Sequence, residues 1–156
     1  MIDDGIVRVR ALLAALHIKG EIIEHPGVDG SHSEDSARAL GVNIGTVINC
    51  LILVSQNGSP VAAIVGGNQR LDVKKLEDVT SLKKLSFASA AVIEQLTGFK
   101  AGGIPPIAVL GKMPAFIDMA LLSKDFVIGS AGTPRAGLKL SPLNLVDAGF
   151  IPMTLC

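Results

Sequence analysis

The sequence predicts one mixed α+β domain, residues 1–156, built on a mostly antiparallel sheet or a partly closed barrel with flanking helices. Three observations support this prediction. A length of 156 residues suits a single hydrophobic core. Segments with helical spacing of apolar residues interleave with short, hairpin-like β-rich runs, without the regular strand–helix alternation of a parallel sheet. No repeat, linker or low-complexity tract divides the chain.

Five segments carry the signals of helices. Apolar residues at helical spacing predict an amphipathic helix over residues 4–18, which Gly20 would end. In the segment SHSEDSARALG, Ser31 and Glu34 have the spacing of a capping box, and Ser33 is a rival cap. Three more helices are predicted to begin after the capping residues Asp72, Ser89 and Ser141.

Short β-rich runs make up most of the remaining chain. Residues 47–54 and 60–65 flank Asn57 and Gly58, a pair that suits a tight β-hairpin turn. The runs EIIEH and LKKLSFA are also predicted as strands. Four further short strands are predicted in the glycine- and proline-punctuated runs GGIPPIAVLG, AFIDMALL, FVIGSAG and GLKL.

The composition argues against several classes of protein. The net charge is zero, so the chain lacks the overall basic charge typical of nonspecific nucleic-acid binding, and we expect no DNA partner. The first 40 residues carry a net charge of −3 and the remainder +3, which leaves room for a modest basic face. Aromatic residues are only 3%, all phenylalanine, so an RNA partner would be held by its backbone or its end.

The same composition predicts a soluble, cytoplasmic protein. No apolar run approaches the roughly 18 residues that a bilayer span needs, and the N-terminal segment does not resemble an export signal. Cys50 and Cys156 lack metal-ligand spacing and fit free thiols in a reducing compartment. The histidines likewise lack zinc-like partners, and we expect neither a metal nor a cofactor.

Two glycine-rich loops are candidates for binding or catalysis. GFKAGGIPP, residues 98–106, combines adjacent glycines with a rigid Pro-Pro exit, so its backbone N–H groups could hold a carbonyl or a developing oxyanion. IGSAGTPRAG, residues 128–137, has a similar composition but lacks the residue order of a phosphate-binding P-loop. From the residues alone, a plain turn is the alternative for each loop.

A third candidate lies in the run TVINCLILV, where Asn49 and Cys50 interrupt an apolar strand. A buried amide costs free energy unless it is hydrogen-bonded, so either the fold satisfies Asn49 or the strand presents it to a ligand. A nucleophilic Cys50 would need a base close by, and the three histidines follow no triad-like pattern. We therefore interpret Cys50 as a small core residue.

Taken together, the chain resembles the YbaK type of aminoacyl-tRNA deacylase, a family that includes the editing domain of bacterial prolyl-tRNA synthetase and its free-standing relatives. The resemblance covers nearly the whole chain and rests on SEDSARALGV, TVINCLILV, VGGNQRLDVKKL, LSFASAAVIEQLTGFKAGGIPP, FIDMALL and IGSAGTPRAGLKLSP. The most specific of these segments is TGFKAGGIPP, which is similar to the family's glycine loop and its G-x-x-x-P pattern.

The resemblance implies a YbaK-like fold and a free-standing trans-editing hydrolase that deacylates mischarged aminoacyl-tRNA, with alanyl or cysteinyl proline tRNA as possible substrates. The attacking group in the family is often water or part of the substrate. Aminoacyl-tRNA is the implied partner, with a synthetase as a possible second one and no membrane. By the same resemblance, the glycine loop would hold the aminoacyl carbonyl through Gly102 and Gly103, with Ile104 and Pro106 beside them, and the facing wall would consist of Gly129, Ala131 and Gly132.

The chain departs from the family in the strand TVINCLILV, where Asn49 aligns with the family's lysine and Cys50 with the Thr or Ser that follows it. The resemblance places Asn49 where the family's strand carries a lysine, and an amide can hydrogen-bond but supplies no charge. We assign Asn49 to the catalytic pocket, and we consider Lys100 and Arg135 as compensating contacts to the tRNA end. The alternative is a non-catalytic homologue that binds aminoacyl-tRNA or a small ligand.

Overall fold

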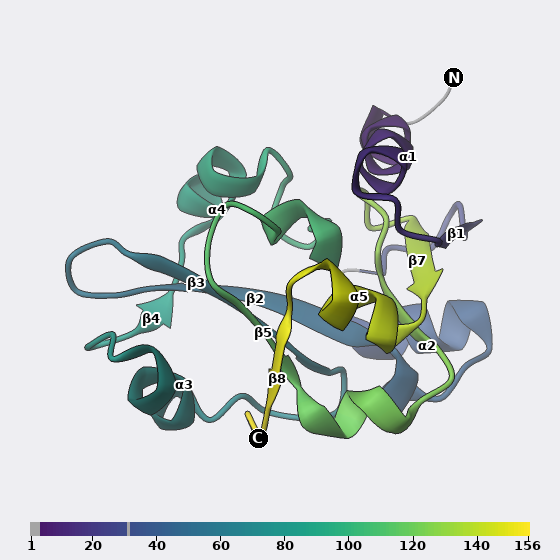
Figure 1. The fold of residues 1–156 in the computed structure, drawn as a ribbon. Coiled ribbons are helices and arrows are strands. Elements are labelled where there is room, and N and C mark those ends of the chain that lie inside the picture. Colours follow the sequence, from purple (N-terminus) through teal and green to yellow (C-terminus); the bar gives the residue numbers. More distant parts are fainter. Residues whose placement is uncertain (1–3, 31) are drawn as a thin grey trace.

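The computed structural model describes residues 4–30 and 32–156, which form a five-stranded mixed sheet and a three-stranded antiparallel sheet (Figure 1). The larger sheet has the strand order β4-β2-β3-β5-β8, in which β3–β5 and β5–β8 are parallel and the other pairs antiparallel. Its strands are β2 (Ile48–Val54), β3 (Pro60–Gly66), β4 (Ser86–Phe87), β5 (Ala115–Asp118) and β8 (Ile151–Met153).

The smaller sheet has the order β1-β7-β6 and consists of β1 (Glu21–Glu24), β6 (Val127–Ser130) and β7 (Ala136–Leu140). A single parallel bridge between Val47 and Ile128 places the start of β2 beside β6. The two sheets therefore meet at this point without closing into a barrel. The predicted fold class is confirmed, in the form of open sheets.

Five α-helices and three short 3₁₀-helices are formed by the described residues. The α-helices are α1 (Asp4–Leu16), α2 (Ser33–Leu40), α3 (Val73–Thr80), α4 (Ala90–Thr97) and α5 (Pro142–Ala148). The 3₁₀-helices are η1 (Ile44–Thr46), η2 (Pro106–Val109) and η3 (Met119–Ser123). Figure 1 shows α3 and α4 on either side of the strands β2 and β3.

Both faces of the β2–β3 hairpin are buried, which explains its nearly continuous apolar sequence. Ile52 and Ile64 pack into the main core with α1, η2 and the smaller sheet, whereas Leu53 and Val61 pack into a second cluster that includes Leu76 of α3. The alternation of side chains along a strand produces this division. The hairpin is therefore fixed from both sides and gives β2 a rigid position.

Local signals predicted most helices correctly. Asp72, Ser89 and Ser141 each accept a backbone N–H bond at the start of α3, α4 and α5, as predicted. The predicted cap at Ser33 is wrong: α2 has His32 at its N-cap position, with no side-chain cap, and Ser33 is the first helical residue. The other predicted cap, Ser31, lies outside the described residues.

The predicted strands are less accurate. The β2–β3 hairpin is confirmed, with Gly58 at φ +85° in its turn. The run GGIPPIAVLG forms η2 instead of a strand, because its prolines cannot donate ladder hydrogen bonds and Pro106 suits the first helical position. AFIDMALL is half strand and half 3₁₀-helix, and only Ser86 and Phe87 of LKKLSFA are extended. The short edge strand β8, which contains Pro152, was not predicted.

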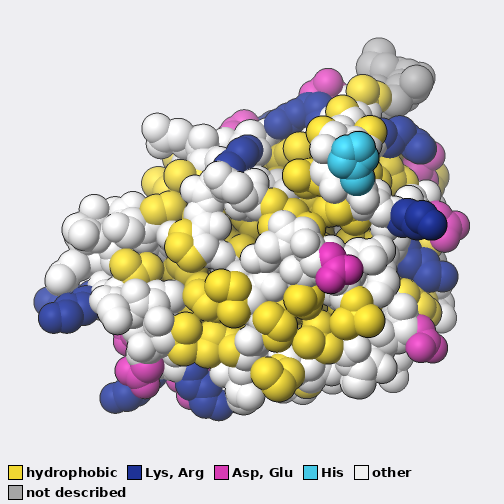
Figure 2. Space-filling view, in the orientation of Figure 1, with side chains coloured by type: hydrophobic (Ala, Val, Ile, Leu, Met, Phe, Trp, Pro, Cys, Tyr) yellow, Lys and Arg dark blue, Asp and Glu magenta, His cyan; other side chains and the backbone are white. Residues whose placement is uncertain are grey.

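One face of the molecule carries an apolar patch. Hydrophobic side chains gather over α5, β8 and η3 in Figure 2, and the large exposed ones there include Met119, Leu143 and Ile151. Among the described helices, none has the length and apolar character needed to cross a membrane.

Candidate functional site

A cavity of about 220 Å³ lies where the two sheets meet. Its walls come from α2, the first residues of β2, the loop after α4, and the β6–β7 hairpin with its loop. Asn49, Gly102, Ile104 and Gly129 all line it, although they are far apart in the sequence. The structure thus brings together four of the residues that the sequence suggested for a site.

Asn49 is held in one orientation by a residue of α2. The Ser33 hydroxyl donates a hydrogen bond of 2.9 Å to Oδ1 of Asn49. The amide nitrogen Nδ2 therefore keeps its two N–H donors, and it has no partner among residues 4–30 and 32–156. The fold thus satisfies the carbonyl oxygen of this amide and leaves its NH₂ group available to a ligand. Ser33 was missed as a site residue because sequence analysis treated it as a helix cap.

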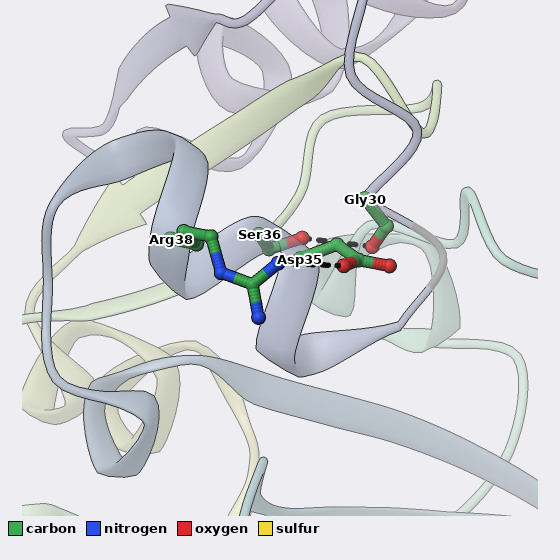
Figure 3. Close-up of polar contacts among 4 residues, drawn as sticks. All are labelled: Gly30, Asp35, Ser36 and Arg38. Carbon is green, nitrogen blue, oxygen red and sulfur yellow. Dashed lines mark hydrogen bonds and ion pairs between the residues drawn. The ribbon is translucent and has the colours of Figure 1, made fainter.

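A set of hydrogen bonds fixes α2 against the β6–β7 loop. Ser36 donates a 2.7 Å bond from its hydroxyl to the carbonyl of Gly30, as Figure 3 shows. The N–H of Gly30 donates in turn to the carbonyl of Pro134 at 2.6 Å. Asp35 and Arg38 form an ion pair at 3.8 Å on the outer surface of α2 (Figure 3). Because both of its side chains are substantially exposed, this pair contributes little to stability.

The two glycine-rich loops meet beside the cavity. A Cβ atom on Gly129 would lie 2.9 Å from Cδ of Pro106, and one on Gly103 would lie 3.4 Å from the backbone of Gly132. Gly102 adopts φ +85°, a conformation that favours glycine. The wall therefore requires small residues at points where one loop packs directly on the other.

Two backbone donors of the first loop remain available. The N–H groups of Gly102 and Ile104 make no hydrogen bond within the described chain, and both residues line the cavity. The N–H of Gly103, by contrast, donates to the carbonyl of Lys100 at 3.0 Å and stabilises the loop itself. Gly102 and Ile104 therefore keep backbone donors that no residue of the described chain uses.

The other residues suggested by the sequence do not line the cavity. Gly103, Pro106, Ala131 and Gly132 support its wall, and Gly132 packs against the start of α1, where a Cβ atom would lie 2.6 Å from the carbonyl oxygen of Gly5. The side chains of Lys100 and Arg135 are exposed.

The cavity lacks an obvious nucleophile or base. Cys50 is half-buried in the lining, and desolvation raises its pKa from 9.0 to about 12, so the thiol stays protonated at neutral pH. Among the residues that the structure describes, no charged side chain and no histidine lines the cavity. Within the described residues, no cluster of three or more His, Cys, Asp or Glu side chains could hold a metal. What the site offers is a set of hydrogen-bond donors in a cavity whose described lining carries no charged side chain.

Comparison with known proteins agrees with this architecture. Residues 25–148 match the family described as the aminoacyl-tRNA editing domain. An Enterococcus faecalis protein provisionally named Cys-tRNA(Pro)/Cys-tRNA(Cys) deacylase EbsC is 30% identical over 81% of this chain and 79% of its own. The proline–tRNA ligase of Citrifermentans bemidjiense is 31% identical over 73% of this chain, which corresponds to 20% of the ligase.

A solved structure shows the same fold over its full length. The crystal structure of a protein described, also provisionally, as a trans-editing enzyme for prolyl tRNA synthetase superposes with a TM-score of 0.87 at 28% identity, covering 99% of this chain and 98% of the other. The family match covers well over half of the chain, and the resemblance deduced from the sequence motifs is confirmed. The protein belongs to the aminoacyl-tRNA editing domain family.

Proposed function

We propose that this protein is a trans-editing hydrolase that cleaves the ester bond between a small amino acid and the terminal ribose of tRNA. It would act in the cytoplasm on aminoacyl-tRNA released by a synthetase. The observation that supports this proposal most directly is the neutral cavity with free donors from Gly102, Ile104 and Asn49. Such donors stabilise the negative charge that develops on a carbonyl oxygen during acyl transfer.

The reaction needs no nucleophilic side chain. The oxygen of a water molecule adds to the ester carbonyl carbon, and the tetrahedral oxyanion is stabilised by the N–H groups of Gly102 and Ile104. The bond to the ribose oxygen then breaks, releasing the amino acid and a free ribose hydroxyl, which takes up the proton lost by water. Because the described lining of the cavity contains no carboxylate or imidazole, we assign the proton transfer to water or to the neighbouring hydroxyl of the substrate.

The size of the cavity supports a small aminoacyl group. About 220 Å³ is below the range of roughly 300 to 1,000 Å³ that is usual for drug-sized ligands. A Cβ on Gly137 would lie 2.8 Å from Cγ2 of Ile128, so this wall is already closely packed. Alanine and cysteine esters on proline tRNA are therefore the substrates to test first, in keeping with the names of the relatives.

The experiment is a deacylation assay with a panel of labelled aminoacyl-tRNAs, led by alanyl and cysteinyl proline tRNA. We expect enzyme-dependent loss of the ester with the native protein. Hydrolysis restricted to a few small amino acids would support the proposal. No hydrolysis across the panel, together with turnover after Asn49→Lys, would instead identify a binding homologue that kept the pocket.

A further inference from the structure

A second cavity, of about 420 Å³, lies between η1, the end of β3, η3 and the C-terminal segment. Its volume falls within the usual range for small-molecule sites. Polar side chains dominate its lining, with three amides from Asn43, Asn68 and Gln69 and one ammonium from Lys124. No motif in the sequence pointed to this cluster.

Three polar groups in this cavity converge on the bare backbone of Gly45. From the position that a Cβ atom on Gly45 would occupy, Oδ1 of Asn43 lies at 3.1 Å, Nζ of Lys124 at 3.4 Å and Nδ2 of Asn68 at 4.0 Å. The Oδ1 atom of Asn43 already has a partner within the fold, because it accepts a 2.7 Å hydrogen bond from the N–H of Gly45. The groups left over, on Lys124 and Asn68, are both donors.

Lys124 lacks a counter-ion within the described chain. It is half-buried, and its ammonium makes neither a hydrogen bond nor an ion pair with residues 4–30 or 32–156. An ammonium without a partner in the described chain is available to pair with an anion. Together with the free Nδ2 of Asn68, this arrangement favours an anionic ligand with several acceptor oxygens.

The cavity also contains one carboxylate, that of Asp118, and its charge stays in the lining together with that of Lys124. Asp118 is buried, and its Oδ1 accepts the backbone N–H of Leu155 at 2.9 Å. The carbonyl of Cys156 accepts a 2.8 Å bond from Nζ of Lys75. These contacts leave Lys124 facing the amide-lined part of the cavity, next to Gly45.

The second cavity adjoins the first across the pairing of β2 with β3. Gly66, which lines the second cavity, pairs with Ile48, which lines the first. The N–H of the next residue, Gly67, donates to the carbonyl of Val47 at 2.6 Å, and a Cβ on Gly67 would lie 2.8 Å from Cβ of Ser33. Ser33 of the first cavity therefore lies beside Gly67, the residue that follows Gly66 of the second cavity.

We propose that the cavity at Lys124 and Asn68 binds a phosphodiester group of the tRNA acceptor end while the aminoacyl ester occupies the first cavity. The inference rests on the proposed function, because the ester and the phosphates of the terminal nucleotides are separated by little more than a ribose. Lys124 supplies the positive charge that Asn49 does not, and Asn68 adds neutral donors. A nucleic-acid phosphate and free phosphate share this chemistry, so the experiment includes both.

The test is the binding of uncharged proline tRNA to the full chain at several salt concentrations. We expect Lys124→Gln to weaken binding about tenfold, the effect of losing one charge-assisted hydrogen bond. The slope of log K against log salt should fall in magnitude by about 0.7 to 0.9, corresponding to one phosphate contact. An unchanged affinity and slope would overturn the proposal.

Three further variants separate this contact from general effects. Lys124→Arg keeps the charge and should keep the salt slope. Asn68→Ala should weaken tRNA binding but leave the salt slope unchanged. Lys74, an exposed residue outside both cavities, provides the matched control, because Lys74→Gln removes the same charge. An equal loss of slope in the control would mean that binding depends on diffuse charge, and this result would contradict the proposal.

Two parallel measurements identify the ligand. If inorganic phosphate raises the melting temperature of the native protein but not of Lys124→Gln, while both bind tRNA with equal slopes, the cavity binds free phosphate and the proposal for tRNA is wrong. Ester hydrolysis is assayed in the same preparations. A native protein that cleaves no ester would refute the proposed function, whereas the slope comparison would still decide the phosphate site.

Discussion

The two cavities, which adjoin where Ile48 pairs with Gly66, differ in charge. The first is closely packed and has no charged side chain in its described lining, whereas the second is larger and contains Lys124 and Asp118. Neutral donors suit the stabilisation of an oxyanion, and an ammonium without a partner in the described chain suits a phosphate. The difference suggests that this chain divides ester cleavage and tRNA anchoring between the two sites. In relatives that carry the family's lysine, the charge would lie within the first cavity itself.

Removal of the Asn49 amide should have the largest effect on this division. Asn49→Ala deletes a donor of the first cavity, so single-turnover ester cleavage should fall about a hundredfold, as for a lost oxyanion-hole donor. The dissociation constant for uncharged tRNA should stay within twofold, because the phosphate contact is elsewhere. A variant that loses affinity but keeps its cleavage rate would break the comparison. Asn49→Gln, which retains the amide on a longer side chain, is the conservative control.

The next effect concerns packing. Gly129→Ala places a methyl group 2.9 Å from Pro106 in the first cavity, and overpacking of this kind costs about 1 to 3 kcal/mol. Gly66→Ala in the second cavity meets its nearest atom at 3.4 Å and should be tolerated. Urea unfolding of both variants measures the contrast. Equal stability would show that the first cavity is no more tightly built than the second.

Loss of the Ser33 hydroxyl should have a smaller effect on catalysis. Ser33→Ala frees Oδ1 of Asn49, so the amide can rotate and present its acceptor to the substrate. We expect cleavage to slow about tenfold, in line with the loss of a hydrogen bond worth about 1 kcal/mol. The double variant with Asn49→Ala should be no slower than Asn49→Ala alone. Additive effects would show that Ser33 acts independently of Asn49.

Lys100 and Arg135 extend the comparison to the outer surface. Both are exposed and outside the cavity lining, so we propose that they contact tRNA only through screened charge. Substitution of either by alanine should raise KM two- to threefold at low salt, consistent with the 0.2 to 1 kcal/mol of exposed charge pairs. The effect should vanish at high salt, with kcat unchanged. A loss of kcat would place one of them in the reaction itself.

Cys50 should show the smallest effect on activity. Its pKa of about 12 keeps the thiol neutral, so Cys50→Ala should change the cleavage rate less than twofold and a thiol reagent should react slowly at pH 8. The unfolded thiol ionises near pH 9.0 and the folded one near 12, so the contribution of Cys50 to stability is lost as the pH rises between these values. The free energy of unfolding, measured against pH for the native protein and for Cys50→Ala, checks that the native protein loses more stability as the pH rises.

Local signals in the sequence predicted the parts of the fold that depend on neighbouring residues. Asp72, Ser89 and Ser141 act as caps because their side chains bond to N–H groups two or three residues away. The strand prediction for GGIPPIAVLG failed because its apolar composition concealed the effect of two prolines. A short run rich in Ile and Val fits either state until its hydrogen-bond donors are considered.

The candidate site was predictable only in part. The resemblance suggested Asn49, Gly102, Ile104 and Gly129, which the fold brings to one cavity. Ser33 was not found, because its bond to Asn49 spans 16 positions and depends on how α2 docks. Lys124 and Gly45 meet only through the packing of η3 beside η1, so no spacing in the sequence revealed the second cavity.

The most direct test is one matched comparison of Asn49→Ala and Lys124→Gln. For each variant and the native protein, the single-turnover rate at saturating alanyl or cysteinyl proline tRNA is measured together with the dissociation constant for uncharged tRNA. We predict that Asn49→Ala lowers only the rate and that Lys124→Gln lowers only the affinity. If both variants change the same quantity, or if neither changes any, the two cavities do not divide cleavage from anchoring and the account is wrong.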